Sequence, residues 1–337
     1  MPGKPPSMLD LARALGVSRA TVSNALRGKG RLSPELAGRI RALAAELRYI
    51  PAHAGRALRT GRSATIGLIV PDFGQPLFPI FAQAIERAAK SRGVAVLVGD
   101  SLGTADGQAA EIDNLVGRGI DALVIIPTRG TLIDAAKIPV PVAVIDSAAT
   151  RGNTAASNHR DGGRQVAGHL IGLGHRDILL LAGPKDSKVS RERTDGMREV
   201  FARAGITPRI RYSVTSFEMG AEIGAEVDLA GLTACAAAYD ALAVGFVTGL
   251  AARGVRVPQD VSVTGFDDLM WARIVSPPLT TVRQDLAAIA DHALAVATGE
   301  RQGARLFPVE LVLRASTARP RPCDRNRTND NRRGGAS

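Results

Sequence analysis

Apolar residues recur at helical spacing in three short groups within the first fifty residues. The first group ends at Gly16, and the second follows Ser18, a residue type that often caps helix N-termini. The third group follows Ser33-Pro34, a typical cap and first-turn pair. The pattern predicts three helices, whose apolar members are Leu9, Leu11, Ala12 and Leu15; Val22, Ala25 and Leu26; and Leu36, Ile40, Leu43, Ala44 and Leu47.

The first two predicted helices are separated by one tight turn. Ala12 is small where the helices would cross, and Gly16 can adopt the left-handed conformation that such a turn requires. This arrangement is typical of a helix-turn-helix, whose second helix enters the major groove of DNA. Ordinary helical hairpins also place small residues at their crossings, so the pattern favours DNA binding without establishing it.

From residue 65 onward, short apolar runs alternate with longer amphipathic stretches in two successive series. Such βαβ alternation predicts two parallel α/β lobes, with a ligand crevice at the carboxyl ends of the strands. The predicted strands are 65–71, 94–98, 122–126 and 142–145, then 177–182, 211–214, 234–237 and 261–266. The predicted helices are 77–92 and 107–117, then 162–173, 191–204, 218–227 and 240–253.

Positive charge is concentrated at the two ends of the chain. Residues 1–63 contain 12 Lys and Arg against 3 Asp and Glu, whereas residues 64–318 contain 25 against 27. A basic head suits phosphate contact and counterion release, which favours a nucleic-acid partner. Only 4% of the residues are aromatic, which argues against single-strand binding by base stacking. The basic tail, residues 319–337, is predicted to be disordered.

The polar face of the second predicted helix carries the candidates for base recognition. Arg19, Ala20 and Asn24 lie opposite its apolar stripe. Arginine suits guanine, asparagine suits adenine, and alanine can contact a thymine methyl group. The other candidates for DNA contact, through phosphates or capping, are Ser18, Thr21, Arg27 and Lys29. Each of these residues is alternatively an ordinary solvent-facing position.

Residues 51–63 connect the head to the body and leave two interpretations open. Ala52 to Leu58 can form a short helix, which Gly55 weakens. The segment is either a flexible linker or a hinge that folds on DNA. In the second case Leu58 is an apolar wedge in the minor groove, and Arg59 lies near phosphates.

Enzyme and transporter functions lack their expected features. We find no dinucleotide-binding or P-loop glycine motif, no nucleophile elbow and no histidine pair at metal-ligand spacing, so we expect no catalytic residue, metal or cofactor. No apolar stretch is long enough to span a membrane, and the amino terminus has no apolar leader, which predicts a cytoplasmic protein. A solute-binding protein of the periplasmic type remains the alternative, because it would share the α/β body.

Several motifs, in order, resemble the LacI/GalR family of bacterial transcription regulators. They are the segment from Val17 to Asp72, Gly174-His175-Arg176-Asp177-Ile178, VPQDVSVTGFDD at 257–268 and PPLTTVRQD at 277–285. The resemblance spans roughly residues 8 to 318 and implies a periplasmic-binding-protein-like body. The expected domains are a headpiece (1–50), a hinge (51–63), an effector-binding and dimerisation domain (64–318) and a disordered tail (319–337). Within that body, we expect a first lobe of about 64–156 and 284–305, and a second of about 157–283 and 306–318.

The resemblance also implies the residues of an effector cleft. Carboxylates and an arginine beside an aromatic plate suit a sugar or another polyhydroxylated ligand. Tyr239 departs from the family, which usually has asparagine there, and Asp146 and Asp267 are alternatively strand-end capping groups. The expected lining is Leu77, Phe78, Asp146, Arg193, Phe217, Tyr239 and Asp267.

The implied partners are double-stranded operator DNA, a small-molecule effector and a second copy of the chain. One recognition helix covers too few base pairs to specify a genomic site, so we expect a homodimer on a near-palindromic operator. The family default is repression that a sugar relieves, with paired hinge leucines, here Leu58, opening a central base step. The identity of the effector and the direction of its effect remain open.

Overall fold

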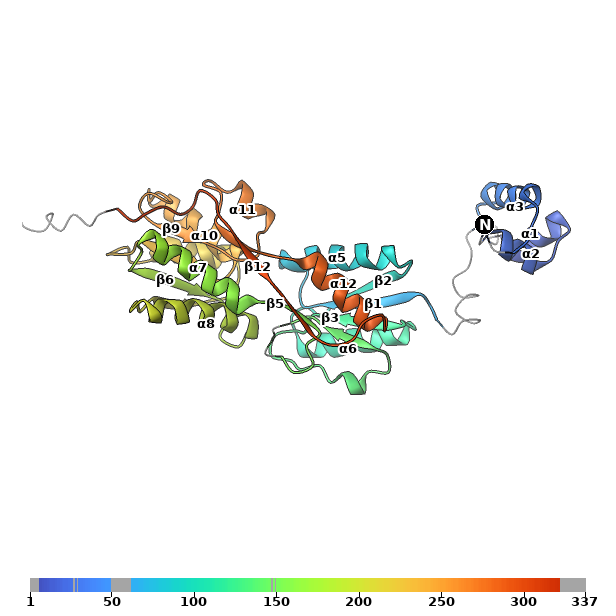
Figure 1. Ribbon diagram of the computed structural model, residues 1–337, viewed down its shortest axis with the longest axis horizontal. Helices are drawn as coiled ribbons and strands as arrows, with labels where there is room; N and C mark the ends of the chain where they lie inside the picture. The colour runs from blue at the N-terminus through green and yellow to red at the C-terminus, as the bar shows by residue number, and fades with distance from the viewer. Residues whose placement is uncertain are drawn as a thin grey trace, which may run out of the picture. The chain divides into compact units, whose positions relative to one another are not determined.

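The computed structural model describes residues 6–26, 28, 30–49, 62–146, 148 and 150–321. The chain divides into two compact units, Met1–Ser63 and Ala64–Ser337 (Figure 1). The sequence-based expectations for Arg27, Lys29 and the segment with Leu58 and Arg59 fall outside the described residues, as does the tail from residue 322.

The headpiece contains the helices that the apolar pattern predicts. Its core consists of side chains from all of them, with Leu11, Val22 and Ile40 fully buried. Gly16 ends the first helix at φ 66°, in the left-handed region, as the turn requires. The Oγ atoms of Ser18 and Ser33 accept the backbone N–H groups of Thr21 (3.0 Å) and Leu36 (3.2 Å). These helices are α1 (Met8–Leu15), α2 (Arg19–Leu26) and α3 (Pro34–Glu46).

The first lobe of the body is a parallel sheet in the strand order β2-β1-β3-β4. Ile66, Leu68 and Val70 of β1 face helices α5 and α12, whereas Ile69 faces the α6 side, because alternate side chains of a strand point to opposite faces. The elements are β1 (Thr65–Val70), α5 (Leu77–Ser91), β2 (Ala95–Asp100), α6 (Ala105–Gly117), β3 (Ala122–Ile125), β4 (Val142–Val144) and α12 (Leu286–Ala297).

The second lobe repeats this architecture with the strand order β7-β6-β8-β9. Its sheet has α7 and α8 on one face and α9 and α10 on the other, with α11 beside α10. The elements are α7 (His159–Leu173), β6 (Ile178–Ala182), α8 (Lys188–Arg203), β7 (Arg209–Tyr212), α9 (Phe217–Glu226), β8 (Ala234–Ala237), α10 (Asp240–Ala252), β9 (Ser262–Thr264) and α11 (Met270–Ile274).

Glycines bring the paired helices of the second lobe into backbone contact. A Cβ atom on Gly163 of α7 would lie 2.1 Å from the carbonyl oxygen of Arg193 in α8. A Cβ on Gly245 of α10 would lie 2.0 Å from the carbonyl oxygen of Phe217 in α9. Any larger residue at these positions would force the helices apart.

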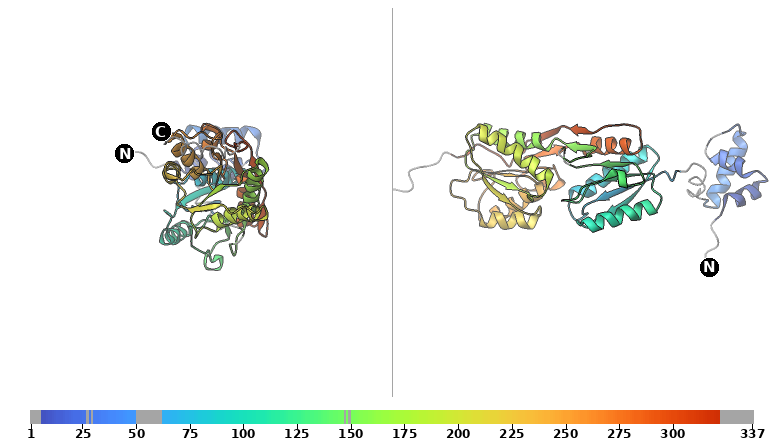
Figure 2. Two further views of the ribbon diagram at one scale, coloured as in Figure 1. Left: turned by 90° about the vertical axis from the view of Figure 1, so that its left-hand side faces the viewer. Right: turned by 90° about the horizontal axis from the view of Figure 1, so that it is seen from below.

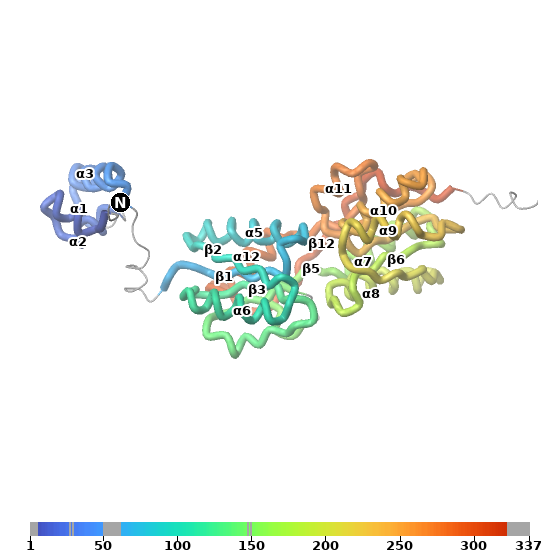
Figure 3. The backbone as a smooth tube through the Cα atoms, turned by 180° about the vertical axis from the view of Figure 1, so that it is seen from behind, coloured from blue at the N-terminus to red at the C-terminus, as the bar shows by residue number. Residues whose placement is uncertain are grey.

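The two lobes are joined by strands that pass between them (Figures 2 and 3). The chain enters the second lobe through β5 (Ala155–Ser157) and leaves it through β10 (Thr281–Gln284). After α12 it returns through β11 (Arg305–Phe307), parallel to β5, and β12 (Val309–Val312), antiparallel to β10. The last described residues rejoin the second lobe, where the N–H of Val263 donates to the carbonyl of Ser316 (2.8 Å).

Candidate functional site

The outward face of α2 holds the predicted base-reading residues together. Arg19 and Ala20 are exposed and Asn24 is half-buried, while Val22 and Ala25 on the opposite face are buried. Asn24 also lies next to the loop that follows α2, since a Cβ on Gly30 would be 3.4 Å from its Nδ2. The arginine side chain and the asparagine amide therefore lie on the same solvent-facing side of this short helix.

Ser18 and Thr21 fix the start of this helix. The Ser18 Oγ accepts a hydrogen bond from the backbone N–H of Thr21, and it also lies 2.9 Å from the Thr21 Oγ1. Both hydroxyls thus lie at the helix N-terminus, where backbone N–H groups and the helix dipole favour a phosphate.

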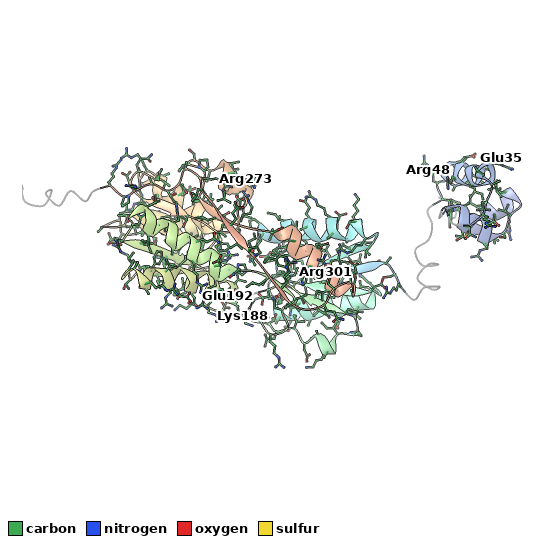
Figure 4. All side chains as sticks on the ribbon, viewed as in Figure 1. Glu35, Arg48, Lys188, Glu192, Arg273 and Arg301 are labelled. Atoms are coloured by element: carbon green, nitrogen blue, oxygen red, sulfur yellow. The ribbon has the colours of Figure 1, made fainter. Side chains whose placement is uncertain are left out.

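Figure 4 shows Glu35 and Arg48 near opposite ends of α3, the third helix of the headpiece.

In the body, a cavity of about 430 Å³ lies between the two lobes and includes residues of the crossover strands in its lining. Phe78 comes from the start of α5, and Asp146 follows β4. Arg193 comes from α8, and Asp267 follows β9. Most of the expected cleft residues therefore meet at one site: Leu77, Phe78, Asp146, Arg193, Tyr239 and Asp267.

Phe217, the remaining expected residue, is not among those that line this cavity. Phe217 is the first residue of α9, and its backbone carbonyl is pressed against Gly245 of α10. The residue is 36% exposed at the surface instead. The aromatic rings beside Arg193 are those of Tyr239, which lines the cavity, and of Phe266, which is buried.

Arg193 is the centre of the polar part of the cavity and is 1% exposed. Its Nη2 donates to Asp267 Oδ1 (2.7 Å), and its Nη1 donates to the carbonyl of Ala238 (2.8 Å). The guanidinium carbon lies 4.6 Å from the centre of the Tyr239 ring and 3.8 Å from that of Phe266. A buried guanidinium needs such partners to offset its desolvation, and they hold it in one orientation.

The buried carboxylates have different environments. Burial raises the pKa of Asp267, and the Arg193 guanidinium opposes that shift. Asp267 Oδ1 also accepts from Gln284 Nε2 (2.8 Å), at the end of crossover strand β10. Burial and the nearby Asp267 raise the pKa of Asp240 well above its usual range, and the hydrogen bonds from Thr281 and Leu269 oppose that shift. Asp240 accepts from the Leu269 N–H (2.8 Å) and the Thr281 hydroxyl (2.5 Å), and thereby positions the loop that carries Asp267.

Sequence reasoning missed two features of the cavity. His159, the first residue of α7, lines it beside Arg193. Arg129, in the loop after β3, forms an ion pair with Asp186, in the loop after β6, at 3.0 Å between Nε and Oδ2. This pair joins the two lobes at the cavity, near the N-terminal end of α8, where Figure 4 shows Lys188 and Glu192. Neither feature has a periodic sequence pattern, because each depends on two residues that are far apart in the sequence.

The described part of the chain has neither a metal-ligating cluster nor a membrane-spanning helix. Within it, no cluster of three or more His, Cys, Asp or Glu side chains is arranged to hold a metal ion. Its helices include none that combines the length and apolar character needed to cross a bilayer.

Both units match protein families. Residues 7–52 match the bacterial regulatory proteins of the lacI family, and residues 167–317 match a periplasmic binding protein-like domain. The chain is 30% identical, over 335 residues, to an uncharacterized HTH-type transcriptional regulator in the aml 5' region of Streptomyces limosus, which covers 93% of this chain and 95% of that one. It is 28% identical to the ribose operon repressor of Escherichia coli K12, covering 90% and 97%.

A solved structure extends the likeness to three dimensions. The crystal structure of the Lac repressor dimer bound to operator and the anti-inducer ONPF superposes with a TM-score of 0.83. The two chains are 29% identical, and the match covers 94% of this chain and 100% of that one. Headpiece and body are therefore shared with this structure, not the body alone.

Proposed function

This chain belongs to the LacI family of bacterial regulatory proteins, and from that membership we propose that it is a transcriptional repressor without catalytic activity. It binds a near-palindromic operator as a homodimer, in the cytoplasm where the chromosome lies. A sugar or sugar derivative in the interlobe cavity controls this binding. The observation that carries the proposal is one chain with an outward polar face on α2 and a carboxylate-lined cavity between two lobes.

The headpiece reads bases through α2. Arg19 donates to guanine O6 and N7, Asn24 pairs with the adenine edge, and Ala20 contacts a thymine methyl group. Ser18 and Thr21 bind phosphate at the helix N-terminus. Further contacts to the DNA backbone and minor groove come from Arg27, Lys29, Leu58 and Arg59.

The cavity suits ligand hydroxyl groups. Asp267 uses Oδ1 for Arg193 and Gln284, while its Oδ2 accepts no hydrogen bond from a described residue. Asp146 Oδ2 accepts from the Thr150 hydroxyl, and within the described chain its Oδ1 has no partner. Each carboxylate therefore keeps an oxygen for a hydroxyl donor. Leu77, Phe78 and Tyr239 supply the apolar surface against which a sugar ring packs.

Control follows from the position of the cavity between the lobes. A ligand that contacts both lobes can favour one relative orientation of the lobes over the other. The size of this shift is set by the difference in the ligand's affinity for the two orientations. In a dimer, that orientation sets the spacing of two headpieces on an operator. Exposed apolar side chains of both lobes, Ile80 and Val98 in the first and Met270 and Ile274 in the second, offer area for a second copy.

The test is a gel-shift titration with the DNA upstream of the protein's own gene, over a series of salt concentrations. We expect a specific complex of two chains per site that a sugar weakens. The control DNA has the same length and composition in scrambled order, and its complex falls steeply with salt. Equal binding to both DNAs would contradict operator recognition and favour a solute-binding function for the body.

A further inference from the structure

His159 occupies an unusual place in the ligand cavity. It is the first residue of α7, directly after the cap residue Asn158 and crossover strand β5. It is 5% exposed and lines the cavity, and its ring packs against that of Phe266 with centroids 5.9 Å apart. The backbone and the neighbouring ring therefore leave the imidazole little freedom to turn.

Arg193 determines which nitrogen of His159 carries the proton. The Arg193 Nε–H donates to His159 Nδ1 at 3.4 Å, so Nδ1 is an acceptor and has no hydrogen. An imidazole that accepts at Nδ1 is neutral, and burial together with the Arg193 charge lowers the pKa of His159 well below its usual range, in the same direction. A neutral imidazole without a proton on Nδ1 carries it on Nε2.

The remaining N–H has no partner in the protein. No described residue forms a hydrogen bond with His159 Nε2, although the residue lines the cavity. His159 is only 5% exposed, so a ligand in the cavity that accepts a hydrogen bond from Nε2–H pairs a donor that the protein leaves unpaired, and gains affinity. The same guanidinium holds Asp267, whose Oδ2 is an open acceptor. Arg193 thus fixes a donor and an acceptor relative to each other.

We propose that His159 is a specificity-determining residue of this cavity, whose Nε2–H donates to a ligand oxygen adjacent to the hydroxyl that Asp267 accepts. The proposal rests on the sugar-binding function proposed above. It selects a vicinal diol, in which one oxygen accepts from His159 and the neighbouring hydroxyl donates to Asp267. A deoxy analogue lacking either oxygen leaves a buried group unpaired and is rejected.

A matched pair of variants separates this role from a structural one. In His159→Gln the amide N–H reaches the position of Nε2, whereas in His159→Asn the side-chain oxygen replaces Nδ1 as acceptor for Arg193 but no donor reaches the cavity. His169→Asn, on the same helix with its ring bonded to Thr317, is the control. The probes are D-ribose, D-xylose, D-glucose, D-galactose and cellobiose, ranked by thermal shift of the full chain and followed by calorimetry.

For the sugar that stabilises the wild type most, we expect His159→Asn to weaken binding by about tenfold or more, and His159→Gln by less than about threefold. Unfolding midpoints should rank the two variants in the opposite order, because only asparagine keeps the Arg193 bond. Equal affinity of His159→Asn and the wild type would overturn the proposal. So would a parallel loss of affinity and stability in both variants.

A second measurement does not need the effector. In nitrogen-15 NMR of the histidine-labelled chain, with the His159→Asn spectrum for assignment, we expect a neutral ring protonated on Nε2 at neutral pH. A proton on Nδ1, or a charged ring, overturns the proposal whatever the ligand is. If no probe stabilises the wild type, the sugar effector fails as a function, while the NMR result still decides the state of His159.

Discussion

The headpiece and the body place their functional residues in different ways. In the headpiece, the base-reading candidates lie within a few residues on α2, and one short helix carries them all. In the body, the cavity combines His159, Arg193, Asp267 and Gln284, which are far apart in the sequence and meet only after the second lobe and its exit strand β10 have folded. The comparison teaches that local patterning determines the first kind of site, whereas tertiary packing creates the second.

The largest effect should follow from removing the central cation of the body. Arg193→Met leaves Asp267 buried without its ion-pair partner, and we expect a loss of about 3–5 kcal/mol in the free energy of unfolding, together with loss of ligand binding. Urea unfolding can be followed by Trp271 in α11, the single tryptophan of the chain. Arg191→Met, on the exposed side of the same helix, is the matched control and should cost less than about 0.5 kcal/mol.

The glycine contacts of the second lobe should rank next. Gly163→Ala places a methyl group against the backbone of α8, and we expect it to destabilise the body by about 1–3 kcal/mol. Gly172→Ala lies in the same helix with no atom within 4 Å of the added methyl, so it should be neutral or stabilising by up to about 1 kcal/mol. If both substitutions behave alike in urea unfolding, the close approach of α7 and α8 does not contribute to stability.

In the headpiece, the expected effect is on recognition rather than on folding. Arg19→Ala should cost about 1–3 kcal/mol of operator affinity and relax the preference at one base pair. Arg39→Ala, an exposed position on α3, should weaken binding to every sequence alike or not at all. Gel shifts with single-base operator variants distinguish the two outcomes. A uniform loss for Arg19→Ala would remove it from base reading.

The smallest effect concerns the ion pair between the lobes. Arg129→Asp or Asp186→Arg replaces attraction by repulsion at the cavity, although both side chains are at least half exposed. We therefore expect a change in ligand affinity worth about 0.2–1 kcal/mol at low salt. The double variant should restore the wild-type value, and added salt should abolish the difference. Single variants that differ from the wild type equally at all salt concentrations would speak against an electrostatic contact.

Sequence periodicity was sufficient for the long elements and insufficient for the joints. The strands of the two sheets and the helices between them follow from the alternation of apolar runs with amphipathic stretches, and most of these strands bury one face or both. Crossover strands β5, β10, β11 and β12 are short and lie outside the βαβ alternation, so the apolar pattern did not predict them. Only the family resemblance implied that the chain returns to the first lobe.

The same division applies to the candidate site. Asp146, Arg193 and Asp267 could be anticipated from the family pattern, and the structure gathers them around one cavity. The absence of Phe217 from the cavity lining could not be anticipated from the sequence, because it depends on where the packing of α9 on α10 places this residue. His159 could not be found, since a single histidine gains meaning only from Arg193, which lies 34 residues away.

One carboxylate oxygen has a further consequence. Asp267 Oδ1 accepts at once from Arg193, anchored in the second lobe, and from Gln284, at the end of a strand that leads out of it. A ligand that rotates the Asp267 carboxylate therefore also changes the hydrogen bond that holds Gln284, at the end of that strand.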